Sequence, residues 1–246
     1  MRRRSVVLSL AVVVSALAPV VAQAAEPRAV IELFTSQGCS SCPPADKLAG
    51  ELMHDSSLIV MSLAIDYWDY LGWKDTLALS GHANRQRAYA RMRGDREVYT
   101  PQVVVNGTVH VVGSDRAAID AAIAQTSKQP GTLSLPVTMA VAGDTVTVTV
   151  PAAKSGETKG EIWLCPISTN VPVAISRGEN TGHTITYHNV VRRWVKIGDW
   201  TGAARTLTVP LHEVGGNEID SFAVVVQAGT KESPGNMLGA AVTSIH

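Results

Sequence analysis

The sequence predicts an α/β domain with a mixed sheet flanked by helices, followed by an all-β, sandwich-like domain. Strand-like and helix-like segments alternate as far as residue 127, an order typical of α/β domains. After Lys128-Gln129-Pro130-Gly131, short β-rich segments follow one another without a helical pattern. These observations place the two domains at residues 25–130 and 131–246.

The first 24 residues read as a leader rather than as part of the fold. Arg2, Arg3 and Arg4 precede an apolar stretch from Val6 to Val21, and Ala22-Gln23-Ala24 has the small-residue pattern of a signal-peptidase site. Residues 1–24 are therefore predicted to be a cleaved signal peptide, with an uncleaved anchor as the alternative. The mature protein is expected to be periplasmic or secreted, with no stable membrane span.

Composition excludes several classes of partner. The formal net charge of zero gives no sign of a protein that binds nucleic acid or anionic membranes. The three cysteines, two of which are only three positions apart, do not have the number and spacing of a domain stabilised by several disulfides. A structural zinc site would need a second pair of ligands, so we expect no metal centre.

The first domain begins with a short strand from Ala29 to Phe34. A helix is predicted from Pro44 to His54, because Leu48 and Leu52 lie on one face. The continuous apolar run from Leu58 to Ile65 is typical of a strand that is buried on both faces. Two strands separated by a helix are expected to pair in parallel.

The rest of this domain is predicted to contain two helices and a hairpin. Ser80 to Arg93 is a helix rich in alanine and arginine. Asn106-Gly107 joins two β-rich runs, Thr100 to Val105 and Thr108 to Val112, and is a strong hairpin signal. Ser114 is expected to cap a helix from Asp115 to Thr126.

The second domain is predicted from β-rich segments between Gly, Asn, Asp and Pro turns. These segments are Thr132 to Met139, Thr145 to Val150, Glu161 to Pro166, Thr184 to His188, Val190 to Ile197, Arg205 to Val209, Ser221 to Ala228 and Leu238 to Ile245.

Chemistry is expected at Cys39-Ser40-Ser41-Cys42, where the first strand ends and a helix begins. Free N–H groups and the helix dipole at such a junction stabilise a thiolate. Cys39 is therefore the expected nucleophile, and Cys42 is expected to resolve a mixed disulfide. The alternative is two unreactive buried cysteines. Cys165 lies among apolar residues and is expected to be an inert core thiol.

Residues 29 to about 127 resemble a thioredoxin domain. The resemblance rests on the CxxC after the first strand, Tyr99-Thr100-Pro101 before the hairpin, and Asn106-Gly107 within it. It implies that Pro101 is a cis-proline facing the dithiol, and that Thr100 and Pro101 contact an extended substrate. The alternative is a trans proline that opens an edge strand and has no functional role. Gly38 stands where thioredoxin has a tryptophan.

Longer strings resemble a family of secreted bacterial proteins without an assigned function. These strings are Phe34 to Asp46, Asp66 to Trp73 and Tyr187 to Arg192. The resemblance covers nearly the whole mature chain and implies a thioredoxin-like domain followed by a β-rich domain.

Three further residues are candidates for the site. Glu32, in the strand before the dithiol, could accept the proton of Cys42 if its side chain points inward. Tyr67 and Trp68 belong to a loop rich in aromatic residues and are predicted to contact a partner; the alternative is that this loop packs against the β-rich domain. Asp46 is interpreted as a carboxylate that complements the helix dipole.

The sequence therefore predicts an exported thiol–disulfide oxidoreductase that needs no cofactor. Its partners would be protein or small-molecule thiols and disulfides. One alternative is a copper-handling protein that binds Cu(I) through the reduced CxxC. Another is a binding module in which the disulfide is only structural.

Overall fold

The computed structural model describes residues 26–95, 97–154 and 159–245. The predicted signal peptide lies outside these residues. In chain order the elements are β1 (Ala29–Thr35), α1 (Pro43–Leu52), β2 (Leu58–Ala64), the short 3-10 helix η1 (Asp69–Leu71), α2 (Ser80–Arg93), β3 (Gln102–Val105), β4 (Val109–Val112), α3 (Arg116–Thr126), β5 (Thr138–Ala142), β6 (Thr145–Val150), β7 (Gly160–Ala174), β8 (Thr184–Val191), β9 (Val195–Trp200), β10 (Arg205–Pro210), α4 (Leu211–Val214), β11 (Ser221–Gly229) and β12 (Pro234–Ser244).

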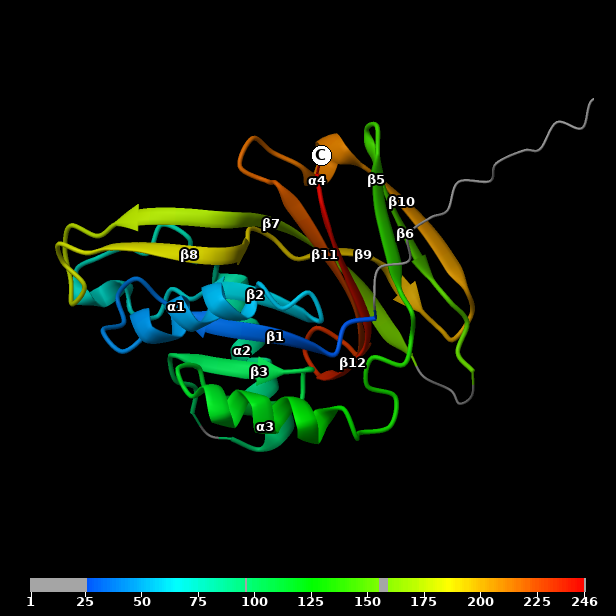
Figure 1. Ribbon diagram of the computed structural model, residues 1–246, viewed down its shortest axis with the longest axis horizontal. Helices are drawn as coiled ribbons and strands as arrows, with labels where there is room; N and C mark the ends of the chain where they lie inside the picture. The colour runs from blue at the N-terminus through cyan, green and yellow to red at the C-terminus, as the bar shows by residue number, and fades with distance from the viewer. Residues whose placement is uncertain (1–25, 96, 155–158, 246) are drawn as a thin grey trace, which may run out of the picture.

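The first half of the chain builds one end of a large sheet (Figure 1). β1 and β2 pair in parallel, as the strand–helix–strand order predicts. β3 pairs antiparallel with β1 and forms a hairpin with β4. Asn106 and Gly107 both have positive φ in the turn, so the hairpin predicted from Asn-Gly is confirmed.

The predicted fold class is wrong, because the sheet does not end with the first domain. Its order is β12-β11-β7-β8-β2-β1-β3-β4, with β9 added beside β7, so nine strands from both halves form one sheet. β8 joins β2 in parallel at the pair Ser62 and Val190. The described chain is mostly β, with only four α-helices, and is not a helix-flanked α/β domain followed by a separate sandwich.

The β2 strand explains why the sheet continues. All seven of its residues are buried, so it cannot serve as a solvent-exposed edge. Strands from the second half cover that edge. A second sheet of three strands, β10-β6-β5, stands beside β11 and β12 and encloses a separate apolar cluster around Trp200 and Phe222. The predicted boundary at residue 130 falls between α3 and β5, within a molecule whose main sheet spans both halves.

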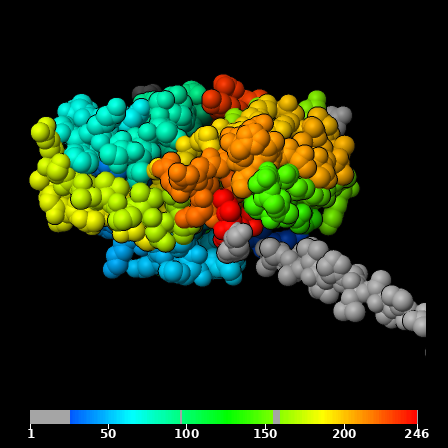
Figure 2. All heavy atoms as spheres, turned by 90° about the horizontal axis from the view of Figure 1, so that it is seen from above, coloured from blue at the N-terminus to red at the C-terminus, as the bar shows by residue number. Residues whose placement is uncertain are grey.

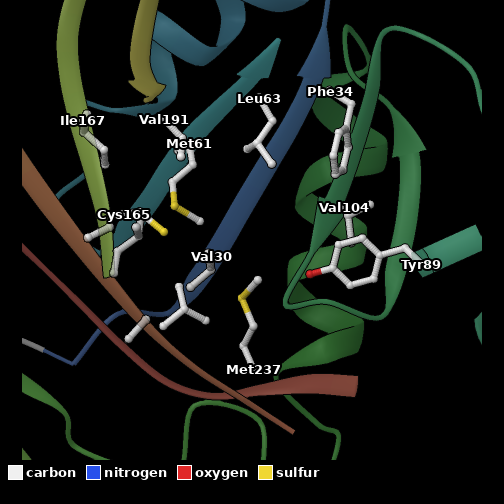
Figure 3. Close-up of a cluster of buried hydrophobic side chains, with 14 of the residues drawn as sticks. Val30, Phe34, Met61, Leu63, Tyr89, Val104, Cys165, Ile167, Val191 and Met237 are labelled. Carbon is white, nitrogen blue, oxygen red and sulfur yellow. The ribbon is translucent and has the colours of Figure 1, made fainter. Parts of the chain in front are cut away.

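Alternate residues of β1 face two different cores. Ile31 and Leu33 pack with α1 and α3 on one face of the sheet. Val30 and Phe34 pack on the other face with Tyr89 of α2 and with residues of the second half, including Cys165 and Met237 (Figure 3). This shared core joins the two halves. Cys165 is a buried free thiol whose pKa is raised by burial, which agrees with its predicted place in the core.

Two helix starts differ from prediction. α1 begins at Pro43, one residue early, because prolines are accommodated in a first turn whose N–H groups have no partners. α3 is capped by Asp115 rather than Ser114, since the Asp115 carboxylate accepts from the N–H of Ala118 at 2.9 Å.

The molecule is elongated, with the β7–β8 hairpin at one end and the three-stranded sheet at the other (Figures 1 and 2). Among the described residues, no helix has the length and apolar character needed to cross a bilayer.

Candidate functional site

Cys39 and Cys42 form a disulfide between the end of β1 and the start of α1, with their Cα atoms 5.4 Å apart. Cys42 is the N-cap of α1, and its carbonyl accepts from the N–H groups of Ala45 and Asp46. Cys42 is fully buried, whereas Cys39 keeps 4% of its surface exposed. Of the two residues, Cys39 is therefore the more accessible to solvent.

The Thr100–Pro101 peptide lies beside the disulfide loop. This bond is cis, as the resemblance to thioredoxin implied. The Ser41 hydroxyl lies 3.4 Å from the sulfur of Cys39 and 3.5 Å from the carbonyl oxygen of Thr100, so it bridges the two segments. A Cβ atom at Gly113 would lie 3.1 Å from Pro101 and 3.2 Å from Ala45, so the absence of a side chain there lets Pro101 approach α1 closely.

The aromatic loop after β2 packs beside the disulfide loop. The indole N–H of Trp68 donates to the Thr100 hydroxyl at 2.8 Å, and Trp68 leaves little room for a side chain at Gly38. Tyr67 donates to Gln86 at 3.1 Å, and burial raises its pKa to about 12. Both predicted contact residues are thus partly buried. Tyr70, which lies against Trp68 and is 75% exposed, offers the free aromatic surface.

The loop between β7 and β8 covers the disulfide loop from the second half of the chain. The buried amide of Asn180 donates to the carbonyls of Gln37 at 2.9 Å and Cys39 at 3.0 Å. Glu179 accepts from the N–H of Ser40 at 3.1 Å. The segment that holds the cysteines is therefore anchored by residues about 140 positions away.

Two carboxyl groups are buried next to this loop. Asp46 lies one helical turn after Cys42, so both side chains lie on one face of α1. The Thr35 hydroxyl donates to one oxygen of Asp46 at 2.7 Å, while the other oxygen is buried without a partner among the described residues. Burial, opposed by this hydrogen bond and assisted by the charge of Asp75, raises the pKa of Asp46 to about 8.

Asp75 and Tyr187 complete this buried group. Asp75 accepts from the N–H groups of Gln37 and Leu77, and burial raises its pKa to about 6. Burial also raises the pKa of Tyr187, as do the charges of Asp46 and Asp75. The Tyr187 hydroxyl, like the free oxygen of Asp46, has no partner in the described part of the chain. The burial of Asp46, one helical turn after Cys42, therefore favours its protonated form.

With this geometry established, comparisons with known proteins place the chain in a family. A family model described as a protein of unknown function, DUF1223, matches residues 30–227. The chain belongs to the DUF1223 family. No match was found among functionally curated proteins.

Two solved structures resemble this DUF1223 chain. One is an X-ray structure of a protein from Agrobacterium tumefaciens, a Northeast Structural Genomics Consortium target. It is 32% identical, with a TM-score of 0.79 over 88% of this chain and 94% of that one. The other is HBP35 of Porphyromonas gingivalis, which is 12% identical with a TM-score of 0.60 over 89% of this chain and 76% of that one. At that identity the second likeness concerns the fold alone.

Glu32 does not join the dithiol in this DUF1223 protein. It shares the face of β1 with Val30 and Phe34, on the α2 side of the sheet, whereas α1 packs on the other side. There the Glu32 carboxylate accepts from Arg85 and from the Tyr89 hydroxyl, both at 2.6 Å. Asp46, rather than Glu32, is the buried acid one helical turn from Cys42.

Sequence reasoning missed Asn180 and Asp75 and took Asp46 for a dipole-complementing carboxylate. No local pattern identifies Asn180, because its contacts are made across the fold. For Asp46, the i to i+4 spacing from Cys42 was a usable signal. Among the described residues of this DUF1223 chain, no group of three His, Cys, Asp or Glu side chains is placed to hold a metal ion.

Asn180→Ala is expected to lower the free energy of unfolding by about 1–3 kcal/mol, because two buried carbonyls lose their donor. Reduction of the disulfide by dithiothreitol should also become faster. Denaturant unfolding and thiol titration would measure both. Asn236→Ala is the matched control, since its amide makes only contacts at 3.5 Å. Equal effects of the two substitutions would contradict the anchoring role.

Proposed function

We propose that the protein is an exported thiol–disulfide oxidoreductase that uses Cys39 as nucleophile and Cys42 as resolving thiol. The observation that carries this proposal is the Cys39–Cys42 disulfide at a strand-to-helix junction, beside the cis Thr100–Pro101 peptide and close in sequence to Asp46, a buried acid whose pKa burial raises to about 8. Export to a periplasmic or extracellular compartment, where disulfides persist, is part of the proposal and rests on the leader sequence.

The exchange starts from the disulfide form. A thiolate of the partner attacks the sulfur of Cys39, forming a mixed disulfide while the Cys39–Cys42 bond breaks. The electron pair of the broken bond leaves on the sulfur of Cys42. A second thiolate of the partner then attacks the partner's sulfur in the mixed disulfide and releases Cys39 as a thiolate. The partner loses two electrons and the CxxC gains them. The reverse sequence reduces a partner disulfide through the same atoms.

Asp46 supplies the proton in the first step. A buried thiolate at Cys42 is unfavourable, because burial disfavours the charged form. The proton of Asp46 neutralises that thiolate, and Asp46 takes the proton back when Cys42 attacks a mixed disulfide. Its unpartnered oxygen is where this proton would reside, since the other oxygen already accepts from Thr35.

The partner is proposed to approach between Thr100–Pro101 and the aromatic loop. Trp68 and Thr100 are held together by their hydrogen bond, which makes this wall rigid. Tyr70 adds an exposed aromatic ring beside Trp68. Exposed aromatic side chains at a preorganised surface contribute strongly to protein recognition.

Cys42→Ser is expected to accumulate a mixed disulfide on Cys39, because the resolving thiol is missing. The mature protein would be incubated with oxidised glutathione and with an exported-protein fraction, and the adducts identified by non-reducing electrophoresis and mass spectrometry. Cys39→Ser is the matched control and should trap nothing, since Cys42 is buried. Absence of adducts on Cys42→Ser, together with no turnover of a peptide disulfide by the wild type, would contradict the proposal.

A further inference from the structure

A cavity of about 320 Å³ opens on the α2 side of the sheet, on the opposite face from α1. Its walls come from the start of α2, from Trp163 of β7, from the segment after β8 and from the turn between β11 and β12. In Figure 2 the turn, in red-orange, lies close to the teal segment that includes α2. The volume is at the lower end of the range for small-molecule sites.

The rim of this cavity is positively charged. Arg192 is paired with Glu218, and Arg85 is paired with Glu32, so neither contributes a free charge. Arg193 instead donates to the carbonyls of Val214 and Gly215, which leaves its charge without a carboxylate partner among the described residues. Lys231 is exposed at the same rim. The rim therefore favours an anionic group.

Two of the wall side chains, Trp163 and Trp194, are indoles. Trp163 and Trp194 meet edge to face, with ring centroids 6.2 Å apart. The Arg85 guanidinium lies 3.9 Å from the centroid of Trp194 and fixes that ring. The two rings are inclined at 73° to each other, so an aromatic ligand that stacks on one indole meets the other edge to face.

His82 gives the cavity a specific polar group. It is fully buried, and its Nδ1 lies 2.9 Å from the carbonyl oxygen of Ala64. Because a carbonyl can only accept, Nδ1 carries the proton. Burial lowers the pKa of His82 to about 4, so Nε2 is an unprotonated acceptor, and it is buried without a partner in the described chain. A ligand that satisfies it must carry a hydrogen-bond donor.

We propose that this cavity binds a small aromatic carboxylate that carries a ring hydroxyl or amino group. The carboxylate would pair with Arg193 and Lys231, the ring would stack on one of the indoles of Trp163 and Trp194 and contact the other through its edge, and the ring donor would reach Nε2 of His82. The site is separate from the disulfide and does not depend on the proposed redox function.

The test uses para-hydroxybenzoate and two probes that each differ from it by one group. Para-hydroxybenzoate is expected to bind the wild-type protein saturably, with quenching of tryptophan fluorescence. Benzoate should bind at least about tenfold more weakly, because it leaves the buried Nε2 without a donor. Para-hydroxybenzyl alcohol, which has no charge, should also bind at least about tenfold more weakly. Equal affinities for the three probes, or no saturable binding of para-hydroxybenzoate up to about 10 mM, would overturn the proposal.

Variants check the placement of the ligand without touching the core. Arg193→Ala combined with Lys231→Ala should weaken binding of para-hydroxybenzoate at least about tenfold and leave the binding of para-hydroxybenzyl alcohol unchanged. Lys196→Ala is the matched control, because Lys196 pairs with Glu161 and Asp199 outside the cavity. If the double variant binds para-hydroxybenzoate as tightly as the control does, the proposed orientation is wrong.

Discussion

Arg85→Met is expected to lower the free energy of unfolding by about 3–5 kcal/mol, because it leaves the Glu32 carboxylate buried without a cation. Arg85 also donates to Tyr89 at 2.6 Å and to Gln227 of β11 at 2.8 Å. The network therefore connects β1, α2 and a strand from the second half of the chain. Loss of this network should destabilise both the packing within the first half of the chain and the contact between the two halves.

Denaturant unfolding, followed by both tryptophan fluorescence and circular dichroism, measures this effect. The double variant Glu32→Gln with Arg85→Met should recover much of the lost stability, since neither charge then remains in the core. Arg28→Met is the control, because its ion pair with Asp55 is exposed. A cost for Arg85→Met no larger than that of the control would show that the buried pair does not hold the halves together.

Asp46→Asn is expected to slow thiol–disulfide exchange by about 100-fold, the lower range for removing a general acid–base group. The amide keeps the shape of the protonated acid and can still accept from Thr35, but it cannot exchange a proton with Cys42. The wild-type rate should show an inflection near pH 8, the pKa to which burial raises Asp46, and the variant should lack it. Asp120→Asn, at an exposed carboxylate of α3, is the control.

The same substitution should change how stability depends on pH. Asp46 is protonated in the folded state up to about pH 8, whereas the unfolded chain loses this proton near pH 4. The folded state therefore holds the extra proton between these values, and its stability falls as the pH rises, by at most about 1.4 kcal/mol per pH unit. Between pH 6 and 8, Asp75 no longer contributes in this way, since its pKa is about 6.

Comparison of wild type and Asp46→Asn by denaturant unfolding at pH 6, 7 and 8 isolates this contribution. The variant should become progressively more stable relative to the wild type as the pH rises. A constant difference across this range would mean that Asp46 is ionised in the folded protein, and it would remove Asp46 as the proton donor. If Asp46→Asn changed the pH dependence of stability but left the exchange rate unchanged, Asp46 would be a buried acid that takes no part in the exchange.

The sequence predicted the local elements of the first half well, because each depends on short-range patterns. The Asn106-Gly107 turn and the parallel pairing of β1 with β2 follow from backbone preferences and strand–helix order. The sheet order could not be predicted in this way. Ser62 of β2 pairs with Val190 of β8, and no pattern near either residue indicates a partner so distant in the chain.

In the candidate site, too, features set by local sequence patterns could be predicted and those set by distant residues could not. The positions of Cys39, Cys42 and Pro101 could be predicted because a CxxC and the segment before a hairpin are recognisable locally. The environment of each buried acid could not be predicted from the sequence. Glu32 and Asp46 are both carboxyls close to the cysteines in sequence. β1 turns Glu32 toward Arg85, whereas α1 buries Asp46 one helical turn after Cys42, with no ion pair among the described residues. Which acid can hold a proton is set by those surroundings.

By itself, the sequence determined that a dithiol stands between a strand and a helix, with a proline segment expected to face it. Only the tertiary structure decided that both halves share one sheet, that Asn180 anchors the disulfide loop, and that Asp46 is the buried acid. The reason is physical. Strand edges and helix starts are fixed by neighbouring residues, whereas sheet continuation and proton affinity depend on which distant residues exclude water from a group.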